Sequence, residues 1–235
     1  RDSSTSRGLG DVYKRQGQAS TWNPELIERM GKVIAAEIRL QGGHICYGPV
    51  LDIVRDPRWS RTEESYGEDC YLTARIGEAY VRGTGSGDLS QSRHALSTLK
   101  HFIAYGASEG GQNGGSNLLG ERELRETYLP PFEAAVKAGA RSVMTAYNSV
   151  DGIPCTANRR MLTDILRGEW GFEGMVTTDW YTHAPQYTEI AAGNDVKMGC
   201  GDPAHTLKMM REGKLSREDV KTSVKRLLEM ILKLA

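Results

Sequence analysis

Short apolar runs alternate with segments of helical period along most of the chain. The first helical segment follows Asn23, which can cap a helix, with Pro24 at the first helical position and Glu25 in the first turn. Apolar residues then recur at positions 26, 27, 30, 33, 34 and 38, and the pair Gly42-Gly43 ends the pattern. The spacing therefore predicts a helix that begins at residue 24.

The same alternation continues to the end of the chain. Strands are expected within 44–50, 95–105, 141–148, 174–179 and 195–199, and further helices within 69–87, 121–139, 159–170, 185–193, 203–213 and 216–235. Near-continuous apolar strands separated by helices indicate an α/β fold with a parallel sheet. A closed (β/α)8 barrel needs eight strands, so about five indicate either an open doubly wound sheet or a barrel that lacks its opening strands. A nucleotide-binding open sheet is disfavoured, because no GxGxxG or P-loop motif is present.

Net charge and cysteine content limit the kinds of partner and site that we expect. The 235 residues have a formal net charge of zero, which gives no reason to expect nucleic acid or a membrane surface as a partner. The four cysteines, at positions 46, 70, 155 and 200, form no CxxC pair. They are typical of reduced thiols rather than a metal site, and they favour a cytoplasmic location.

The amino-terminal segment differs from the rest. Residues 1–16, RDSSTSRGLGDVYKRQ, are polar and have neither helical nor strand period. We interpret them as a non-native leader, like translated linker sequence, and assign residues 17–235 to the fold.

Residues suited to chemistry follow four of the expected strands. The loop after the first strand holds Arg61 among carboxylates and the aromatic residues Trp59 and Tyr66. Such a loop is either a solvated set of ion pairs or a site for a polyhydroxylated ligand. The loop after the third strand holds Tyr147, for which a buried tyrosine with a hydrogen-bonded hydroxyl is an equally good interpretation.

Lys100 and His101 are adjacent near the end of the second strand. Adjacent strand residues normally point to opposite faces, so both reach one ligand only if the backbone bends there. We therefore hypothesise a strained backbone over residues 100–102, which includes a non-proline cis bond. The alternative is a surface lysine beside a core histidine.

Asp179 and Trp180 end the fourth strand, where a parallel sheet faces its ligand. A carboxylate surrounded by cations and aromatic residues suits glycoside chemistry, in which an ionised carboxylate attacks the sugar and a protonated one donates to the leaving group. Cationic neighbours keep the attacking carboxylate ionised. Trp180 would supply a flat apolar wall for the sugar.

Four ordered segments resemble the signature segments of glycoside hydrolase family three, in its β-glucosidase and β-xylosidase branch. They are GPVLDIVRDPRWSRTEESYGED, LKHFIAYGASEGG, LPPFEAAVKAGARSVMTAYNSVDGIPCTAN and LTDILRGEWGFEGMVTTDW. The resemblance implies an incomplete (β/α)8-type, TIM-like barrel that lacks its opening strands, with an α/β sandwich domain following it in the family. It also implies a retaining hydrolysis of β-linked glucosides or xylosides without a metal or other cofactor.

When the motifs are matched one by one, the resemblance implies that Asp179 is the nucleophile. The residues that match substrate-binding positions are Arg61, Lys100, His101, Tyr147 and Trp180. The family's acid/base Glu usually comes from the sandwich domain, and its upstream substrate-binding Asp lies before the first matched segment. Neither has a counterpart in this sequence.

Two alternatives stay open. The chain could be an inactive sugar-binding fragment, because no acid is present to protonate a leaving group. It could also be a Schiff-base aldolase that uses Lys100, although that interpretation leaves the arginine, tryptophan and tyrosine unexplained.

Overall fold

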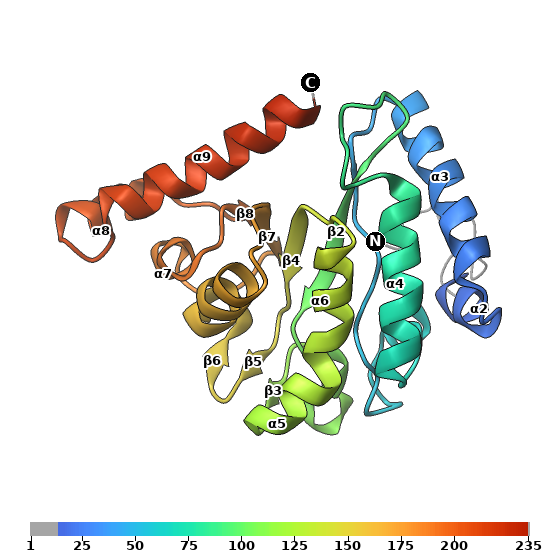
Figure 1. The fold of residues 1–235 in the computed structure, drawn as a ribbon. Helices are drawn as coiled ribbons and strands as arrows, with labels where there is room; N and C mark the ends of the chain where they lie inside the picture. The colour runs from blue at the N-terminus through green and yellow to red at the C-terminus, as the bar shows by residue number, and fades with distance from the viewer. Residues whose placement is uncertain (1–13, 235) are drawn as a thin grey trace.

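A computed structural model describes residues 14–234 and contains a five-stranded parallel sheet in the order β1-β2-β4-β7-β8 (Figure 1). All five predicted strands are confirmed. Neighbouring strands follow one another in chain order, without the reversal that defines a doubly wound sheet. The sheet is therefore a partial (β/α) barrel. Its strands are β1 (Ile45–Cys46), β2 (Leu96–Phe102), β4 (Ser142–Thr145), β7 (Met175–Trp180) and β8 (Val196–Met198).

The predicted helices are also confirmed. The α-helices are α2 (Lys14–Ser20), α3 (Pro24–Leu40), α4 (Cys70–Thr84), α5 (Glu121–Glu123), α6 (Leu129–Lys137), α7 (Gln186–Ala192), α8 (Pro203–Arg211) and α9 (Arg217–Leu234). Two further segments, η4 (Leu124–Tyr128) and η6 (Arg160–Glu169), are π-helical. One residue separates the end of η4 from Pro130 and Pro131, which have no backbone N–H to continue the α-helical bonding of the preceding turn.

Local sequence signals set the ends of the first long helices. The Asn23 side chain accepts a hydrogen bond from the backbone N–H of Leu26 at 3.0 Å, as the sequence predicts. Asp69 caps α4 in the same way, through the N–H of Leu72 at 2.6 Å. Gly85 ends α4 with φ of 72°, a left-handed conformation that favours glycine.

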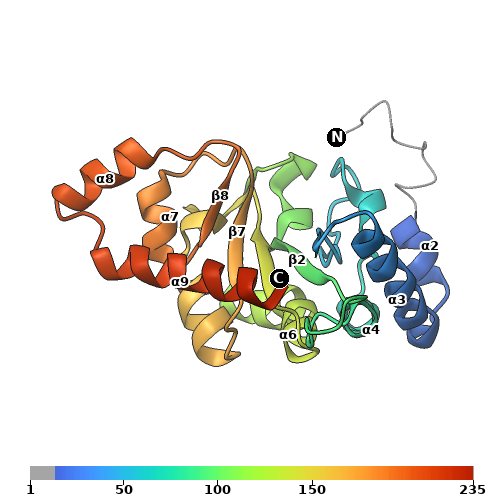
Figure 2. The same cartoon turned by 90° about the horizontal axis from the view of Figure 1, so that it is seen from above.

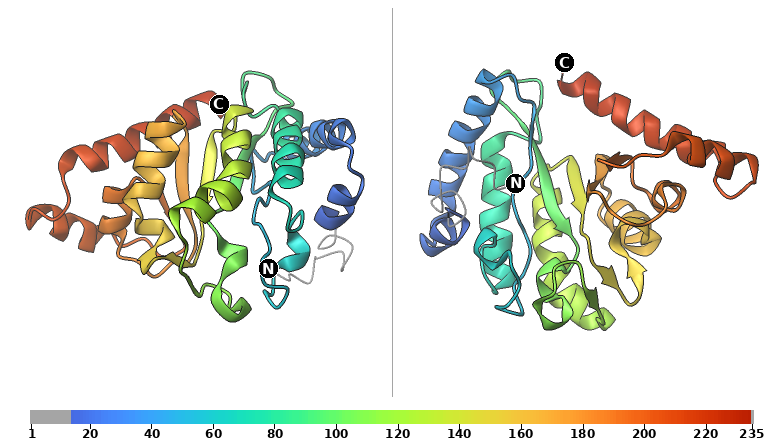
Figure 3. Two further views of the ribbon diagram at one scale, coloured as in Figure 1. Left: turned by 60° about the horizontal axis from the view of Figure 1, so that its bottom comes forward. Right: turned by 180° about the vertical axis from the view of Figure 1, so that it is seen from behind.

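The two ends of the sheet are covered differently. Figure 1 shows α9 crossing the end where the strands begin, and the right-hand view of Figure 3 shows the same arrangement from behind. A second, three-stranded sheet lies at the opposite end, where the strands finish. It consists of β3 (Ser116–Asn117), β5 (Ser149–Val150) and β6 (Ile153–Pro154) and is not predicted from the sequence.

The five-stranded sheet is curved, as the view from above in Figure 2 shows. The hydroxyl group of Tyr47, which follows β1, lies 3.4 Å from the sulfur of Met198 at the end of β8. The first and last strands of the sheet therefore approach one another at their carboxyl ends, which gathers the strand ends around one space.

The core fills the space between the sheet and helices α3, α4 and α6. Phe102 of β2 packs edge to face on Phe132 of α6, with ring centroids 5.2 Å apart. Trp59 and Tyr66 are 2% and 3% exposed and belong to this core. The sequence left open whether their loop is solvated or holds a ligand, and the structure buries both rings instead.

The leader assignment needs one correction. Residues 14–16 lie in α2, and the guanidinium group of Arg15 donates a hydrogen bond to the Tyr66 hydroxyl at 3.1 Å. It also lies 5.1 Å from the centroid of the Tyr80 ring. Arg15 therefore packs on the fold, and the helix that carries it begins within the segment interpreted as a leader. Residues 1–13 lie outside the described residues.

Within residues 14–234, no helix is long and apolar enough to cross a membrane. The same residues contain no cluster of three or more His, Cys, Asp or Glu side chains suited to a metal ion.

Candidate active site

The carboxyl ends of β2, β4 and β7 bring together all the residues that the sequence selected. Asp179 is the penultimate residue of β7, Lys100 and His101 lie in β2, and Tyr147 follows β4. The chain from Val50 runs beside β2, because the N–H of Leu51 donates to the carbonyl of Lys100 at 2.6 Å. This places the loop that contains Arg61 against the same strand ends.

The centre of the cluster is the contact between His101 and Asp179. The Nε2 atom of His101 lies 3.4 Å from the Oδ2 atom of Asp179. Both atoms are buried, and neither has a hydrogen-bond partner among the described residues. The other oxygen of Asp179, Oδ1, accepts a hydrogen bond from the N–H of Trp180 at 2.7 Å. The Asp179 carboxylate is therefore oriented by the backbone N–H of the next residue, with one oxygen turned toward His101.

Asp52 is a site residue that the sequence interpretation missed. Its Oδ2 lies 2.7 Å from Nδ1 of His101, and both of its oxygens accept from the His101 backbone N–H, at 3.3 and 3.2 Å. The Asp52 side chain is completely buried. Burial raises the pKa of Asp52 to about 7, against the opposing influence of Arg61. The available signal was a carboxylate inside the apolar run VLDIV, which must find a partner when it is buried.

Lys100 and His101 both belong to the site. The Lys100–His101 peptide bond is cis, as is Phe102–Ile103, and the expected non-proline cis bond is confirmed. Burial lowers the pKa of Lys100, and the positive charge of Arg61 lowers it further, whereas Glu64 and Asp179 oppose this shift. Burial, together with Arg61 and Lys100, also lowers the pKa of His101 well below its usual value. His101 is therefore a neutral imidazole near pH 7.

Arg61 is held in place by Glu64, another residue that the sequence interpretation did not single out. Burial disfavours the charge on Arg61, but its hydrogen bonds with Glu64 raise its pKa. The guanidinium carbon lies 5.5 Å from the centroid of the Tyr105 ring. That ring also packs edge to face on His101, with centroids 5.0 Å apart. Tyr105 therefore connects Arg61 to the Asp179–His101 contact.

Tyr147 and Trp180 border the cluster on the other side. The Tyr147 hydroxyl donates to the backbone carbonyl of Trp180 at 2.6 Å, so Tyr147 fixes the end of β7. Burial raises the pKa of Tyr147, and the nearby charge of Asp179 raises it further. The Trp180 side chain is 55% exposed, which leaves its indole available to a ligand.

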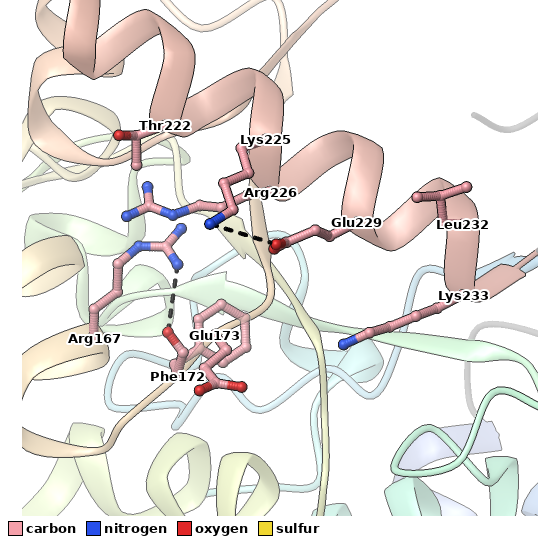
Figure 4. A pocket seen from close by; sticks show the side chains of 9 residues that line it. All are labelled: Arg167, Phe172, Glu173, Thr222, Lys225, Arg226, Glu229, Leu232 and Lys233. Atoms are coloured by element: carbon pink, nitrogen blue, oxygen red, sulfur yellow. Dashed lines mark hydrogen bonds and ion pairs between the residues drawn. The ribbon is translucent and has the colours of Figure 1, made fainter.

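A pocket elsewhere in the molecule is not part of this cluster. Figure 4 shows it between α9 and the segment before β7, at the end of the sheet opposite Asp179. Part of its polar lining pairs within the pocket, since Lys225 lies 3.8 Å from Glu229 and Arg167 donates to the carbonyl of Phe172. It presents no arrangement suited to the chemistry of the strand-end cluster.

Comparison with known proteins agrees with this geometry. The sequence model of the glycosyl hydrolase family 3 N terminal domain matches residues 5–230. The chain belongs to glycosyl hydrolase family 3. Within this family, the sheet is an incomplete TIM-like barrel. The match begins at residue 5, before the expected end of the leader at residue 16, which agrees with the packing of Arg15 on Tyr66.

Similar proteins carry the names of two activities. The chain is 48% identical over 166 residues to a β-xylosidase of Formosa agariphila, covering 68% of this chain and 23% of the relative. It is 39% identical over 216 residues to a β-glucosidase of Rhizobium radiobacter, covering 90% of this chain and 26% of the relative. The chain thus spans about a quarter of the length of these relatives.

A solved β-glucosidase structure superimposes closely. It is a D270A mutant of a β-glucosidase from Listeria innocua in complex with laminaribiose. The TM-score is 0.89 at 35% identity, and the alignment covers 94% of this chain and 33% of the other. The agreement extends over nearly all of the present chain and supports its partial barrel.

Proposed function

We propose that this chain forms the nucleophile half of a retaining β-glycosidase that acts on terminal β-glucosides or β-xylosides. The observation that carries the proposal is the placement of Asp179 at the end of β7, with one oxygen facing His101 and with Lys100, Tyr147 and Trp180 nearby. The related proteins named β-glucosidase and β-xylosidase support the substrate class. No metal or other cofactor enters this chemistry.

In this proposal, one carboxylate oxygen of Asp179 attacks the anomeric carbon and displaces the aglycone. A covalent glycosyl-enzyme forms, and water then releases the sugar with net retention. Arg61 and Lys100 donate hydrogen bonds to sugar hydroxyl groups, and His101 contacts the same sugar, while Trp180 lines the sugar's apolar face and Tyr147 holds the strand end in place.

The acid/base residue is proposed to lie on the sandwich domain that follows the barrel in the family. The two other carboxylates of the cluster are not suited to that role. Asp52 is completely buried behind His101, and Glu64 is bound by the guanidinium fork of Arg61. A sugar-binding fragment without turnover is therefore the alternative for the isolated chain.

The test is turnover of two aryl glycosides, a β-glucoside and a β-xyloside, each with an activated leaving group. Such substrates need little acid assistance, so the chain should release the phenol slowly without a sandwich domain. Asp179→Asn should abolish release, whereas Asp164→Asn, on the exposed side of η6, should not. Binding without any release would favour the sugar-binding fragment.

The lowered pKa of Lys100 is the one observation that favours the aldolase alternative. Borohydride trapping with a carbonyl substrate distinguishes the two, because only a Schiff base at Lys100 would be reduced to a stable adduct. We expect no adduct. The cytoplasmic location is tested by none of these observations and stays a prediction.

A further inference from the structure

We propose that Asp52 is a positioning residue that carries a proton, and that this proton fixes His101 as the tautomer whose Nε2–H faces Asp179. This inference rests on the proposed function, because it identifies the hydrogen-bond donor that faces the proposed nucleophile, Asp179. The tautomer itself is a property of the folded chain and does not require catalysis.

The geometry leaves two arrangements for a neutral His101. If Nδ1 carries the hydrogen, it donates to an ionised Asp52 at 2.7 Å, and the lone pair of Nε2 faces Asp179 Oδ2 at 3.4 Å. Two acceptors then oppose each other in a buried site, where both atoms have no other partner among the described residues. If Nε2 carries the hydrogen, it is directed at the carboxylate oxygen, and Nδ1 must accept.

Nδ1 can accept at this position only from a donor on Asp52, which is a protonated carboxyl group. Burial raises the pKa of Asp52 to about 7, which makes a proton available there. The other charged groups that act on the pair are Arg61 and Lys100, together with Glu64 and Asp179. The positive charges of Arg61 and Lys100 disfavour a positive charge on His101. The additional proton therefore resides on Asp52 rather than on the imidazole ring.

Asp52→Asn separates the two arrangements. An asparagine amide can accept from the His101 backbone N–H with its oxygen and donate to Nδ1 with its NH2 group, as a protonated carboxyl group would. The variant should therefore preserve the Nε2–H tautomer. An ionised Asp52 would instead be a pure acceptor, and the same substitution would remove the charge that holds Nδ1–H.

The first measurement is the 15N chemical shifts of the His101 ring in the 235-residue chain, assigned by comparison with His101→Gln. At pH 6, we expect Nε2–H in both wild type and Asp52→Asn. Above pH 7 the wild type should shift toward Nδ1–H as Asp52 ionises, with a midpoint near the pKa of about 7, whereas the variant should not. An Nδ1–H tautomer or an imidazolium ring in the wild type at pH 6 would overturn the proposal.

The second measurement is the pH dependence of covalent labelling by an activated 2-deoxy-2-fluoro-β-glucoside. Asp52→Asn should label within about threefold of the wild-type rate at pH 6 and keep that rate at pH 8, where the wild type should slow about tenfold as the facing hydrogen is lost. Asp56→Asn, in the same loop but paired with the exposed Arg58, is the matched control and should follow the wild type.

A hundredfold loss in a folded Asp52→Asn would contradict the proposal. Absence of labelling in every protein would instead refute the glycosidase proposal, and the ring shifts would still decide the tautomer.

Discussion

Arg61 donates hydrogen bonds from Nε and Nη2 to the two carboxylate oxygens of Glu64, both at 2.7 Å. The two residues are three positions apart and flank the short turn that follows Trp59. This paired geometry fixes the plane of the guanidinium group beside Tyr105. The orientation of the arginine in the site therefore depends on a carboxylate whose task is structural rather than chemical.

Replacement of Arg61 by Lys should weaken sugar binding. An ammonium group is a point charge and cannot satisfy both oxygens of Glu64 while it also contacts a ligand. We expect the dissociation constant for glucose, measured by calorimetry, to rise about tenfold, which corresponds to one charge-assisted hydrogen bond of ordinary strength. Arg58→Lys, at an exposed position of the same loop, should leave it unchanged. Equal affinity in the two variants would refute a role for Arg61 in binding.

The Arg61–Glu64 pair should also make stability depend on pH in acid. Burial alone would raise the pKa of Glu64, but its hydrogen bonds with Arg61 lower it on balance. A lowered folded-state pKa contributes stability that is present above the unfolded value of about 4.3 and is lost as the pH falls through the folded value. The free energy of unfolding of wild type relative to Glu64→Gln should therefore be constant from pH 5.5 to 7 and decline below pH 4. If the stability of wild type relative to Glu64→Gln instead grew as the pH fell, the lowered pKa of Glu64 would be contradicted.

Much of the fold could be predicted because its signals are local. The apolar period and the glycine stop define α3, and a short apolar run followed by polar residues defines β7. Asp179 could be found for the same reason, since the end of a parallel strand is visible as a change in composition. The adjacency of Lys100 and His101 likewise carried enough information to predict an unusual backbone.

The missed features depend on contacts between distant segments. Asp52 contacts His101, which lies 49 positions later in the sequence, and the run VLDIV gives no indication of that partner. The small sheet is built from two-residue strands, which are too short to show a period. The burial of Trp59 could not be predicted, because an aromatic residue in a polar loop can be buried by segments far away in the sequence.

A buried charge cluster outside the site should determine much of the stability. The Asp195 side chain is completely buried, and its oxygens accept from Arg167 at 2.9 Å and from Arg226 at 3.2 Å. Asp195→Ala would leave the buried Arg167 without its counter-charge, at a cost of about 3–5 kcal/mol in the free energy of unfolding. Urea unfolding should detect this loss, whereas exposed Asp164→Ala should stay within about 0.5 kcal/mol of wild type. Equal midpoints and slopes for the two variants would show that the cluster contributes little.

Trp180 should matter for ligands and little for stability. Its side chain is 55% exposed, so Trp180→Ala removes little buried area, and we expect the free energy of unfolding to change by about 1 kcal/mol or less. Loss of the indole wall should nevertheless weaken binding of an aryl β-glucoside about tenfold, as measured by inhibition of labelling. Tyr71→Ala, at an exposed aromatic position on α4, should affect neither property. A large loss of stability with unchanged binding would show that Trp180 supports the fold rather than the ligand.

The central claim is that Asp179 forms a covalent bond to the sugar. The most direct measurement is mass spectrometry of the chain after incubation with an activated 2-deoxy-2-fluoro-β-glucoside, followed by digestion and sequencing of the modified peptide. We predict a mass increase of one fluorosugar, located on Asp179 in the peptide that contains GMVTTDW, and no increase in Asp179→Asn. A label on another residue, or the same label in Asp179→Asn, would contradict the account.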